Sequence, residues 1–227
     1  MVESYLRQSP LAHLGLDARV VAEPGEARLW LTERRYLTKI NVRGQAIEKE
    51  VKKATGLDLP LTPNTTSQGN GLTGLWLGPD EWLIVGPPGA ERALVEALDG
   101  AARAVIDVSE GRTVIRLAGP MARDVLAMGC PLDLHPSVFT AGQCAQSHLA
   151  RTTIILDQVD NAPVYDVYVE RSQADYLWTW FERAGEAYGV AIVAEPPVAA
   201  SWRRPAKRKA AKKKDEPESG DAVADQT

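Results

Sequence analysis

Along residues 115–134, IRLAGPMARDVLAMGCPLDL, the apolar positions first alternate and then change to a helical spacing. The alternation predicts a strand, which the glycine and proline that follow would end. Beyond the proline, the apolar positions are spaced i, i+3, i+4 and i+7, at Ala122, Val125, Leu126 and Gly129. This spacing puts them on one side of a helix. The stretch therefore predicts a strand followed by a helix with one buried face.

A similar pattern occurs 75 residues earlier in the chain. The stretch INVRGQAIEKEVKKATGLDL, residues 40–59, aligns with residues 115–134 and has the same strand, glycine, helix and Leu-Asp-Leu exit. Its predicted helix has an apolar face at Ile47, Val51 and Ala54. The two stretches indicate an internal repeat.

The residues after each copy also correspond. Residues 74–86, GLWLGPDEWLIVG, predict a hairpin that turns at Gly78-Pro79-Asp80, and a helix is expected near 90–99. Residues 150–169 predict a second hairpin with its turn at 160–163. A helix should then begin at Ser172, with Asp175 as its capping-box partner. That helix carries an apolar stripe at Ala174, Leu177, Trp178, Phe181, Ala184, Gly185 and Tyr188.

The predicted fold class is therefore α+β, with duplicated strand–helix–hairpin–helix halves around a pseudo-twofold axis. The repeats span about 27–100 and 103–190, within one domain at residues 1–202. Residues 203–227 contain eight basic side chains in twelve positions and then five acidic ones, with no large apolar residue after Pro205 except Val223. Such a segment buries too little apolar surface to offset its ordering entropy, so we expect a disordered, basic-then-acidic tail.

Charge and hydropathy exclude some classes of protein. The domain carries 18 basic and 25 acidic side chains, and the basic tail has no interleaved aromatic residues, which makes nucleic acid an improbable partner. No apolar run approaches the roughly 18–20 residues that cross a membrane, and the first residues do not read as a signal peptide. We expect a cytoplasmic protein without membrane association, whose Cys130 and Cys144 are free thiols.

No sequence motif identifies a catalytic centre. Pro120 removes a backbone donor from the junction at Gly119, and the junction matches no phosphate-binding pattern, so we interpret it as a structural turn. Cys130 follows the end of a predicted helix, where the dipole disfavours a thiolate. The histidines and cysteines lack the spacing of a metal site, and we expect no catalytic residue and no metal ligand. The histidines are His13, His135 and His148.

Several long stretches resemble the gamma subunit of heterotetrameric bacterial sarcosine oxidase. They are LPLTPNT (59–65), GLWLGPDEWLIVGP (74–87), VIDVSEGRTVIRLAGPMARDVLAMGCPLDLHP (105–136), GQCAQSHLARTTIIL (142–156) and YDVYVERSQADYLWTWF (165–181). The resemblance implies a folate-binding aminomethyltransferase (glycine-cleavage T-protein-like) fold. It also implies alpha, beta and delta subunits as partners in a complex that oxidises sarcosine to glycine, with hydrogen peroxide and formaldehyde or 5,10-methylenetetrahydrofolate.

In that family the resemblance places FAD, FMN, NAD and tetrahydrofolate on the larger subunits and zinc on delta, so this chain would bind no cofactor and would have a structural role. The body tryptophans are then candidates for subunit interfaces. They are Trp30, Trp76, Trp82, Trp178 and Trp180, with Trp202 at the start of the tail. The alternative is a stand-alone folate-binding protein or folate-dependent aminomethyltransferase.

The resemblance suggests one ligand-binding residue. Asp166, in VYDVYV, takes the position of the glutamate that contacts the pterin in the T-protein group, and a carboxylate suits the paired N–H donors of a pterin. The group's Gly-Tyr-Thr-Gly-Glu is replaced here by TTIILDQ, and GLTGLWLG stands where its acidic catalytic strand is expected. The other interpretation of Asp166 is an aspartate on the exposed face of an alternating strand.

Overall fold

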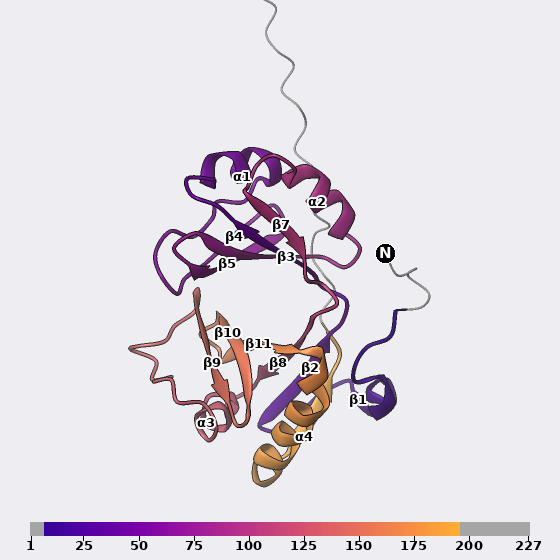
Figure 1. Ribbon diagram of the computed structural model, residues 1–227. Helices are drawn as coiled ribbons and strands as arrows, with labels where there is room; N and C mark the ends of the chain where they lie inside the picture. The colour runs from indigo at the N-terminus through magenta and orange to yellow at the C-terminus, as the bar shows by residue number, and fades with distance from the viewer. Residues whose placement is uncertain (1–6, 196–227) are drawn as a thin grey trace, which may run out of the picture.

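The computed structural model describes residues 7–195 of the chain. Two β-sheets face each other, and helices cover the outer face of each, so the molecule has four layers (Figure 1). Trp202 and the predicted tail at 203–227 lie outside the described residues. No helix within residues 7–195 is both long enough and apolar enough to span a membrane.

The first half of the chain supplies a five-stranded sheet with the strand order β4-β5-β6-β3-β7. Its strands are β3 (Thr38–Arg43), β4 (Thr66–Gly69), β5 (Leu72–Gly78), β6 (Glu81–Gly86) and β7 (Ala104–Asp107). Helices α1 (Glu48–Thr55) and α2 (Glu91–Leu98) cover its outer face. The predicted hairpin of residues 74–86 is β5 and β6, and its turn is where the sequence placed it.

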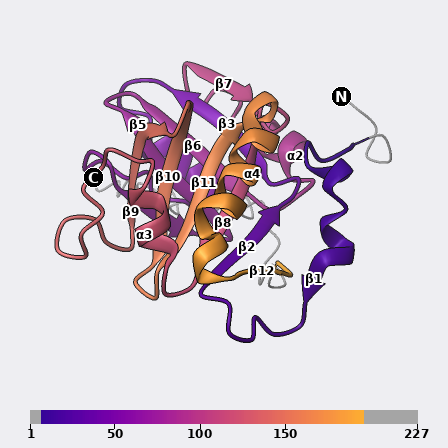
Figure 2. The same ribbon diagram turned by 90° about the horizontal axis from the view of Figure 1, so that it is seen from below.

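The second half, together with β1 and β2 from the beginning of the chain, builds a seven-stranded sheet with the order β1-β12-β2-β8-β11-β10-β9. Its strands are β1 (Val20–Val21), β2 (Leu29–Arg34), β8 (Arg112–Ala118), β9 (Gln143–Leu149), β10 (Thr152–Asp160), β11 (Val164–Glu170) and β12 (Val190–Val193). Helices α3 (Ala122–Ala127) and α4 (Ala174–Gly185) pack below it, as Figure 2 shows from that side. Short 3₁₀ helices complete the chain at Ala12–Leu14, Leu16–Arg19, Arg171–Gln173 and Glu186–Tyr188.

The order of elements repeats, as the sequence pattern predicts. β3–α1–β4–β5–β6–α2 in the first half corresponds to β8–α3–β9–β10–β11–α4 in the second, and the strand order β4-β5-β6-β3 of one sheet matches β9-β10-β11-β8 of the other. The strand that precedes each copy is exchanged between the sheets, since β7 comes before β8 in the chain but pairs with β3. β2 comes from the beginning of the chain but lies in the second sheet, antiparallel to β8 and parallel to β12. Each half is thus tied to the other by its own backbone.

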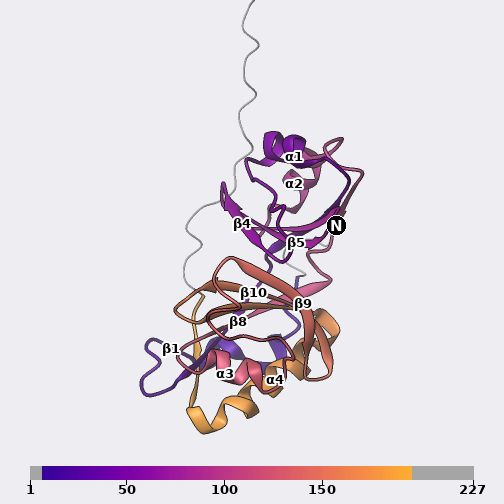
Figure 3. The same cartoon turned by 90° about the vertical axis from the view of Figure 1, so that its left-hand side faces the viewer.

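Three apolar clusters hold the four layers together. The outer two lie between each sheet and its helices, around Trp178 in the second half and Trp82 in the first. The third lies between the sheets, where β5 and β6 contribute Leu75 and Leu83 while β10 and β11 contribute Ile155 and Tyr168. Figure 3 shows the same stacking from the side. Burial on both faces explains the apolar runs at residues 154–156 of β10 and 167–169 of β11.

Helix α3 is shorter than predicted. It ends at Ala127, so Gly129 lies beyond it rather than on its buried face. A Cβ atom on Gly129 would come within 2.7 Å of the Trp180 ring. Gly129 therefore allows α4 to approach closely. The small residue at this position is explained by its contact with Trp180 and not by a place on the buried face of α3.

The predicted capping box of α4 is wrong. Ser172 lies in a 3₁₀ turn, and the N-cap residue is Gln173, which makes no capping bond through its side chain. Asp175 instead pairs with His13 at 2.9 Å, in an exposed contact with the N-terminal segment. A tertiary partner here replaces the local one that the spacing suggested.

Candidate functional site between the two sheets

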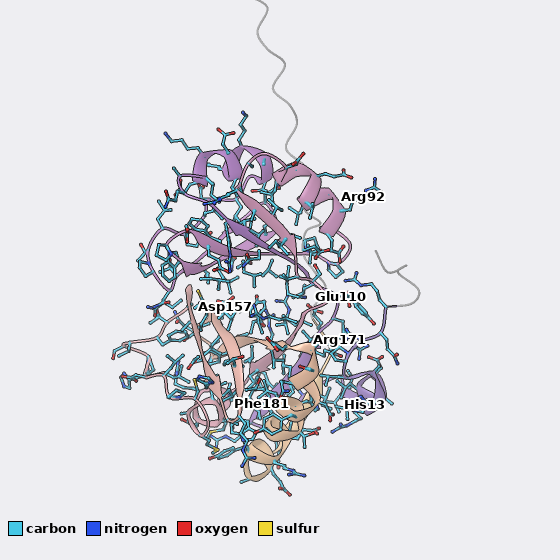
Figure 4. The ribbon with its side chains drawn as sticks, viewed as in Figure 1. His13, Arg92, Glu110, Asp157, Arg171 and Phe181 are labelled. Atoms are coloured by element: carbon cyan, nitrogen blue, oxygen red, sulfur yellow. The ribbon has the colours of Figure 1, made fainter. Side chains whose placement is uncertain are left out.

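Alternation along the strands brings charged side chains into the space between the sheets. In β8, β10 and β11, every second residue faces the helices, as Ile115, Leu156 and Val167 do. The intervening residues face the other sheet. The charged members of this second set, with the β2 residue that joins them, are Arg34, Arg116, Asp157 and Asp166. Figure 4 shows Asp157 between the two layers.

Asp166 is the residue that the family resemblance singled out, and it is buried, with 2% of its surface exposed. Its alternative interpretation as an exposed strand residue is therefore wrong. Arg116, its paired residue on β8, donates from Nε to Oδ1 at 2.7 Å and from Nη2 to Oδ2 at 2.8 Å. Arg34 donates from Nη1 to Oδ2 at 2.6 Å. Both carboxylate oxygens thus already accept charged hydrogen bonds.

Arg34 extends the network to the end of the described chain. Its Nε donates to Glu195 at 2.8 Å. Burial lowers the pKa of Arg34, but Asp166, Tyr168 and Glu195 together outweigh that effect, and the net shift is upward. The guanidinium is therefore a fixed positive charge held between two carboxylates, across β2, β11 and the segment after β12.

Asp157 has a different environment, although it lies directly opposite Asp166 in the β10–β11 ladder. It is 5% exposed, and its carboxyl group has no hydrogen-bond partner among residues 7–195. Burial first, and the Asp166 carboxylate second, raise the pKa of Asp157 to about 7. Two neighbouring carboxyl groups thus differ in their hydrogen bonding, because the arginines donate to Asp166 and leave Asp157 without a donor.

A cavity of about 210 Å³ adjoins these groups. The charged wall belongs to the seven-stranded sheet, and the opposite wall is neutral, with Gln68, Thr73 and Val85 from β4, β5 and β6. An apolar cavity of about 150 Å³ is known to hold a benzene molecule, so this space is large enough for a small ligand. No local sequence pattern indicated this cavity, because its walls come from both repeats.

The two cysteines are free and buried, as predicted. Burial raises the pKa of the Cys144 thiol to about 12, with a smaller effect of the same sign from Asp157. Its Sγ lies 3.4 Å from the Thr65 carbonyl oxygen, in the contact between β9 and the first half. Cys130 lies against Ser147, Sγ to Oγ at 3.8 Å. The Cys144 thiol therefore lacks the low pKa that a nucleophile needs.

The junction at Gly119 is a close backbone contact. Gly119 has φ +98°, and a Cβ atom there would lie 2.7 Å from the carbonyl oxygen of Arg28. The same oxygen accepts a hydrogen bond from the Met121 amide. The glycine and the helix start are thus explained by packing against the strand that enters β2, which agrees with a structural turn.

Metal-ligating side chains are scattered. Within residues 7–195, no group of three or more His, Cys, Asp or Glu side chains is arranged to hold a metal ion. His13 pairs with Asp175, and His135 contacts the Ser137 hydroxyl.

The tryptophans are less available to partners than the sequence suggested. Trp82 and Trp178 are buried inside the outer two cores. Trp30, Trp76 and Trp180 are half-buried, and the indole of Trp30 donates to the Ala27 carbonyl. The large apolar side chains that are exposed are mostly aliphatic: Val20, Val21, Leu61, Ile106, Met128, Val138 and Tyr176.

Solved structures define the class of fold. The aminomethyltransferase T of the glycine cleavage system from Bartonella henselae matches with a TM-score of 0.63 at 18% identity, over 83% of this chain and 59% of that one. At that identity the match establishes the fold alone, which is the aminomethyltransferase-like fold that the family resemblance implied and the predicted repeats agree with. A chain of the heterotetrameric sarcosine oxidase from Corynebacterium sp. U-96, in complex with pyrrole 2-carboxylate, matches with a TM-score of 0.72 at 32% identity. That match covers 83% of this chain and all of the other.

Sequence comparison gives the particular family. The sarcosine oxidase gamma subunit family matches residues 41–187. The sarcosine oxidase subunit gamma of an Arthrobacter species is 37% identical over 158 residues, which is 66% of this chain and 76% of the relative. That of Corynebacterium sp. strain U-96 is 34% identical over 165 residues, 69% and 80% of the two chains. The chain belongs to the sarcosine oxidase gamma subunit family.

Sequence reasoning missed three members of the charged cluster, Arg34, Arg116 and Asp157. A signal was available for two of them. Arg116 lies between Ile115 and Leu117, and Asp157 follows the apolar run at residues 154–156. A charge at such a strand position needs a partner. Arg34 gave no such signal, because the transfer of β2 to the second sheet brings it there.

Proposed function

We propose that this chain is the gamma subunit of a flavin-dependent heterotetrameric sarcosine oxidase and that it serves assembly rather than catalysis. The proposal is carried by the match to a chain of a heterotetrameric sarcosine oxidase over the whole length of that chain. It is supported by the state of the reactive groups. The two thiols are buried, and Asp166 is held by two arginines.

The reaction proposed for the complex is the conversion of sarcosine to glycine, with hydrogen peroxide and formaldehyde, or 5,10-methylenetetrahydrofolate when tetrahydrofolate is present. We propose alpha, beta and delta subunits as the partners, with FAD, FMN, NAD and tetrahydrofolate on the larger subunits, zinc on delta and no cofactor on this chain. A cytoplasmic location is part of the proposal and is supported by the two unbridged cysteines.

The test is a pull-down of the tagged full chain from its native host grown on sarcosine. We expect a yellow eluate of several chains that oxidises sarcosine. A matched pull-down with a Met128→Asp, Val138→Asp double variant asks whether the exposed aliphatic side chains contribute to assembly. A colourless single chain from sarcosine-induced cells, or turnover of sarcosine by the purified chain alone, would overturn the proposal.

A retained folate site at Asp166 is the second candidate, favoured by the aminomethyltransferase-like fold and by the place of Asp166 on the cavity wall. The arginines use three of the roughly four acceptor positions of this carboxylate, so a pterin could donate to both oxygens only by displacing an N–H of Arg34 or Arg116 from Oδ2. Calorimetric titration of the full chain with tetrahydrofolate tests it. Binding that Asp166→Ala abolishes would support the candidate, and a flat titration would dismiss it.

A further inference from the structure

The buried carboxyl group of Asp157 is the one cavity-lining charge of the described chain that no other side chain neutralises directly. Arg34 and Arg116 are both bonded to Asp166, and neither donates to Asp157. Their charges are also balanced, since Asp166 and Glu195 accept from them. An ionised Asp157 would therefore be an uncompensated negative charge in a buried site, which is costly.

The opposite wall supplies nothing to relieve that charge. The cavity-lining residues of the five-stranded sheet and its loops carry no ionisable side chain: Leu37, Gln68, Gly71, Thr73, Val85, Gly86 and Pro87. The remaining titratable neighbours are Tyr168 and Cys144, which pairs with Asp157 across β9 and β10. Both are buried, and burial followed by the nearby aspartates raises the pKa of each. The cavity thus has room for a small molecule, and one acceptor on its wall is without a donor.

We propose that the cavity between the two sheets binds a small organic cation with N–H donors, an ammonium or amidinium group, which pairs with the Asp157 carboxylate. Such a ligand supplies both the positive charge and the hydrogen bonds that the protein does not supply. Gln68 and Thr73 offer polar contacts, while Val85 and Pro87 suit a methyl or short alkyl group. A cation site in this cavity goes beyond the proposed role as a subunit of sarcosine oxidase, and either proposal can fail without the other.

Binding should displace a proton. Since the pKa of Asp157 lies near 7 in the empty cavity, the carboxyl group is mostly protonated at pH 6, and a cation can bind only as that proton leaves. The balance is one carboxylic acid and one cation giving one ion pair and one released proton. We expect release of about 0.9 proton per ligand at pH 6 and nearly none at pH 8.5. Affinity should rise about tenfold per pH unit below pH 7 and then level off.

The experiment is calorimetric titration of the purified full chain with methylammonium or acetamidinium chloride, at constant ionic strength set by tetramethylammonium chloride. Repeating it in two buffers of different ionisation enthalpy counts the protons released. Tetramethylammonium is the control cation, since it carries the charge without an N–H donor. We expect methylammonium and acetamidinium to bind in the presence of tetramethylammonium, with proton release at pH 6.

Two variants complete the test. Asp157→Asn should weaken binding at least tenfold and abolish proton release. Asp80→Asn, in the exposed turn of the β5–β6 hairpin and outside the cavity lining, should change neither. Binding without proton release in the wild-type chain, equal binding by Asp157→Asn, or no binding of either probe would overturn the proposal. The wild-type proton count requires no substitution, so a variant that misfolds leaves the test intact.

Discussion

Arg116 and Asp166 occupy directly paired positions on β8 and β11, and the guanidinium group bonds to both oxygens of the carboxylate, at 2.7 and 2.8 Å. The carboxylate side chain is 2% exposed and the arginine side chain 17%. A buried pair of this kind gains little over an apolar pair of the same size, because both charges lose their hydration. The loss of one partner is costly, since the other charge is left buried.

Asp166→Ala should therefore lower the free energy of unfolding by roughly 3 kcal/mol, because Arg116 loses its buried counterion. The double variant Arg116→Met, Asp166→Leu should lose less, since Arg34 keeps Glu195. Urea denaturation at pH 7 measures the free energy of unfolding of the full wild-type chain, of Asp166→Ala and of the double variant. Asp58→Ala is the control, because its pair with Lys52 is exposed on both sides and should be worth less than about 1 kcal/mol. Equal losses for Asp58→Ala and Asp166→Ala would contradict the role given to the buried pair.

Asp157 should make the fold less stable as the pH rises. Its pKa is raised to about 7 by burial and by Asp166, above the ordinary value of 3.8, so the folded chain binds this proton more tightly than the unfolded chain. The contribution is complete below pH 3.8 and is lost between pH 3.8 and pH 7, by at most about 4 kcal/mol.

Asp157→Asn removes that titration. Relative to the wild-type chain, the variant should gain stability between pH 5 and pH 8, in ligand-free buffer. Urea denaturation of both proteins at pH 5 and pH 8 gives the free energy of unfolding of the variant relative to the wild-type chain at each pH. We expect this relative value to rise from pH 5 to pH 8, with Asp80→Asn as the charge-matched control. A constant gap between Asp157→Asn and the wild-type chain would mean that the Asp157 carboxyl group titrates normally.

The repeat was predictable from the sequence because each half folds by local rules. Alternation in residues 115–118, the turn at Asp160-Asn161-Ala162-Pro163 and the helix spacing around Val125 all act within a few residues, and the strands, hairpins and helices form where they indicate. Errors occur where a distant partner decides the outcome. Trp180 determines the use of Gly129, and His13 takes the place of Ser172 beside Asp175.

The candidate site was less predictable for the same reason. Asp166 could be marked by resemblance, but its burial depends on Arg34, which β2 carries into the second sheet from 132 residues away. The cavity needs both sheets in place, and no local pattern in either repeat encodes their separation.

The thiols should be inert in the folded chain. Cys144 is fully buried, and burial raises its pKa to about 12, while Cys130 is 6% exposed. A thiol reagent added at pH 8 should label both only at the rate of unfolding, and in urea both should react fully. Mass spectrometry of the labelled chain assigns each site. Rapid labelling of either cysteine in the native chain would show that its β9 or α3 environment opens without global unfolding.

Two glycines allow the close contact at Gly119 to be separated from its backbone conformation. Gly119 and Gly142 have similar positive φ values, +98° and +85°, which cost any alanine about 1 kcal/mol or more. A Cβ atom at Gly119 would lie 2.7 Å from the Arg28 carbonyl oxygen, whereas at Gly142 nothing lies within 4 Å. Gly119→Ala should therefore destabilise the chain by at least about 1 kcal/mol more than Gly142→Ala, since a backbone oxygen in a strand junction cannot easily move. Thermal and urea denaturation of the two variants give the comparison. Equal losses would mean that the strand entering β2 yields to the new methyl group, and that the junction is looser than its hydrogen bond from Met121 to Arg28 indicates.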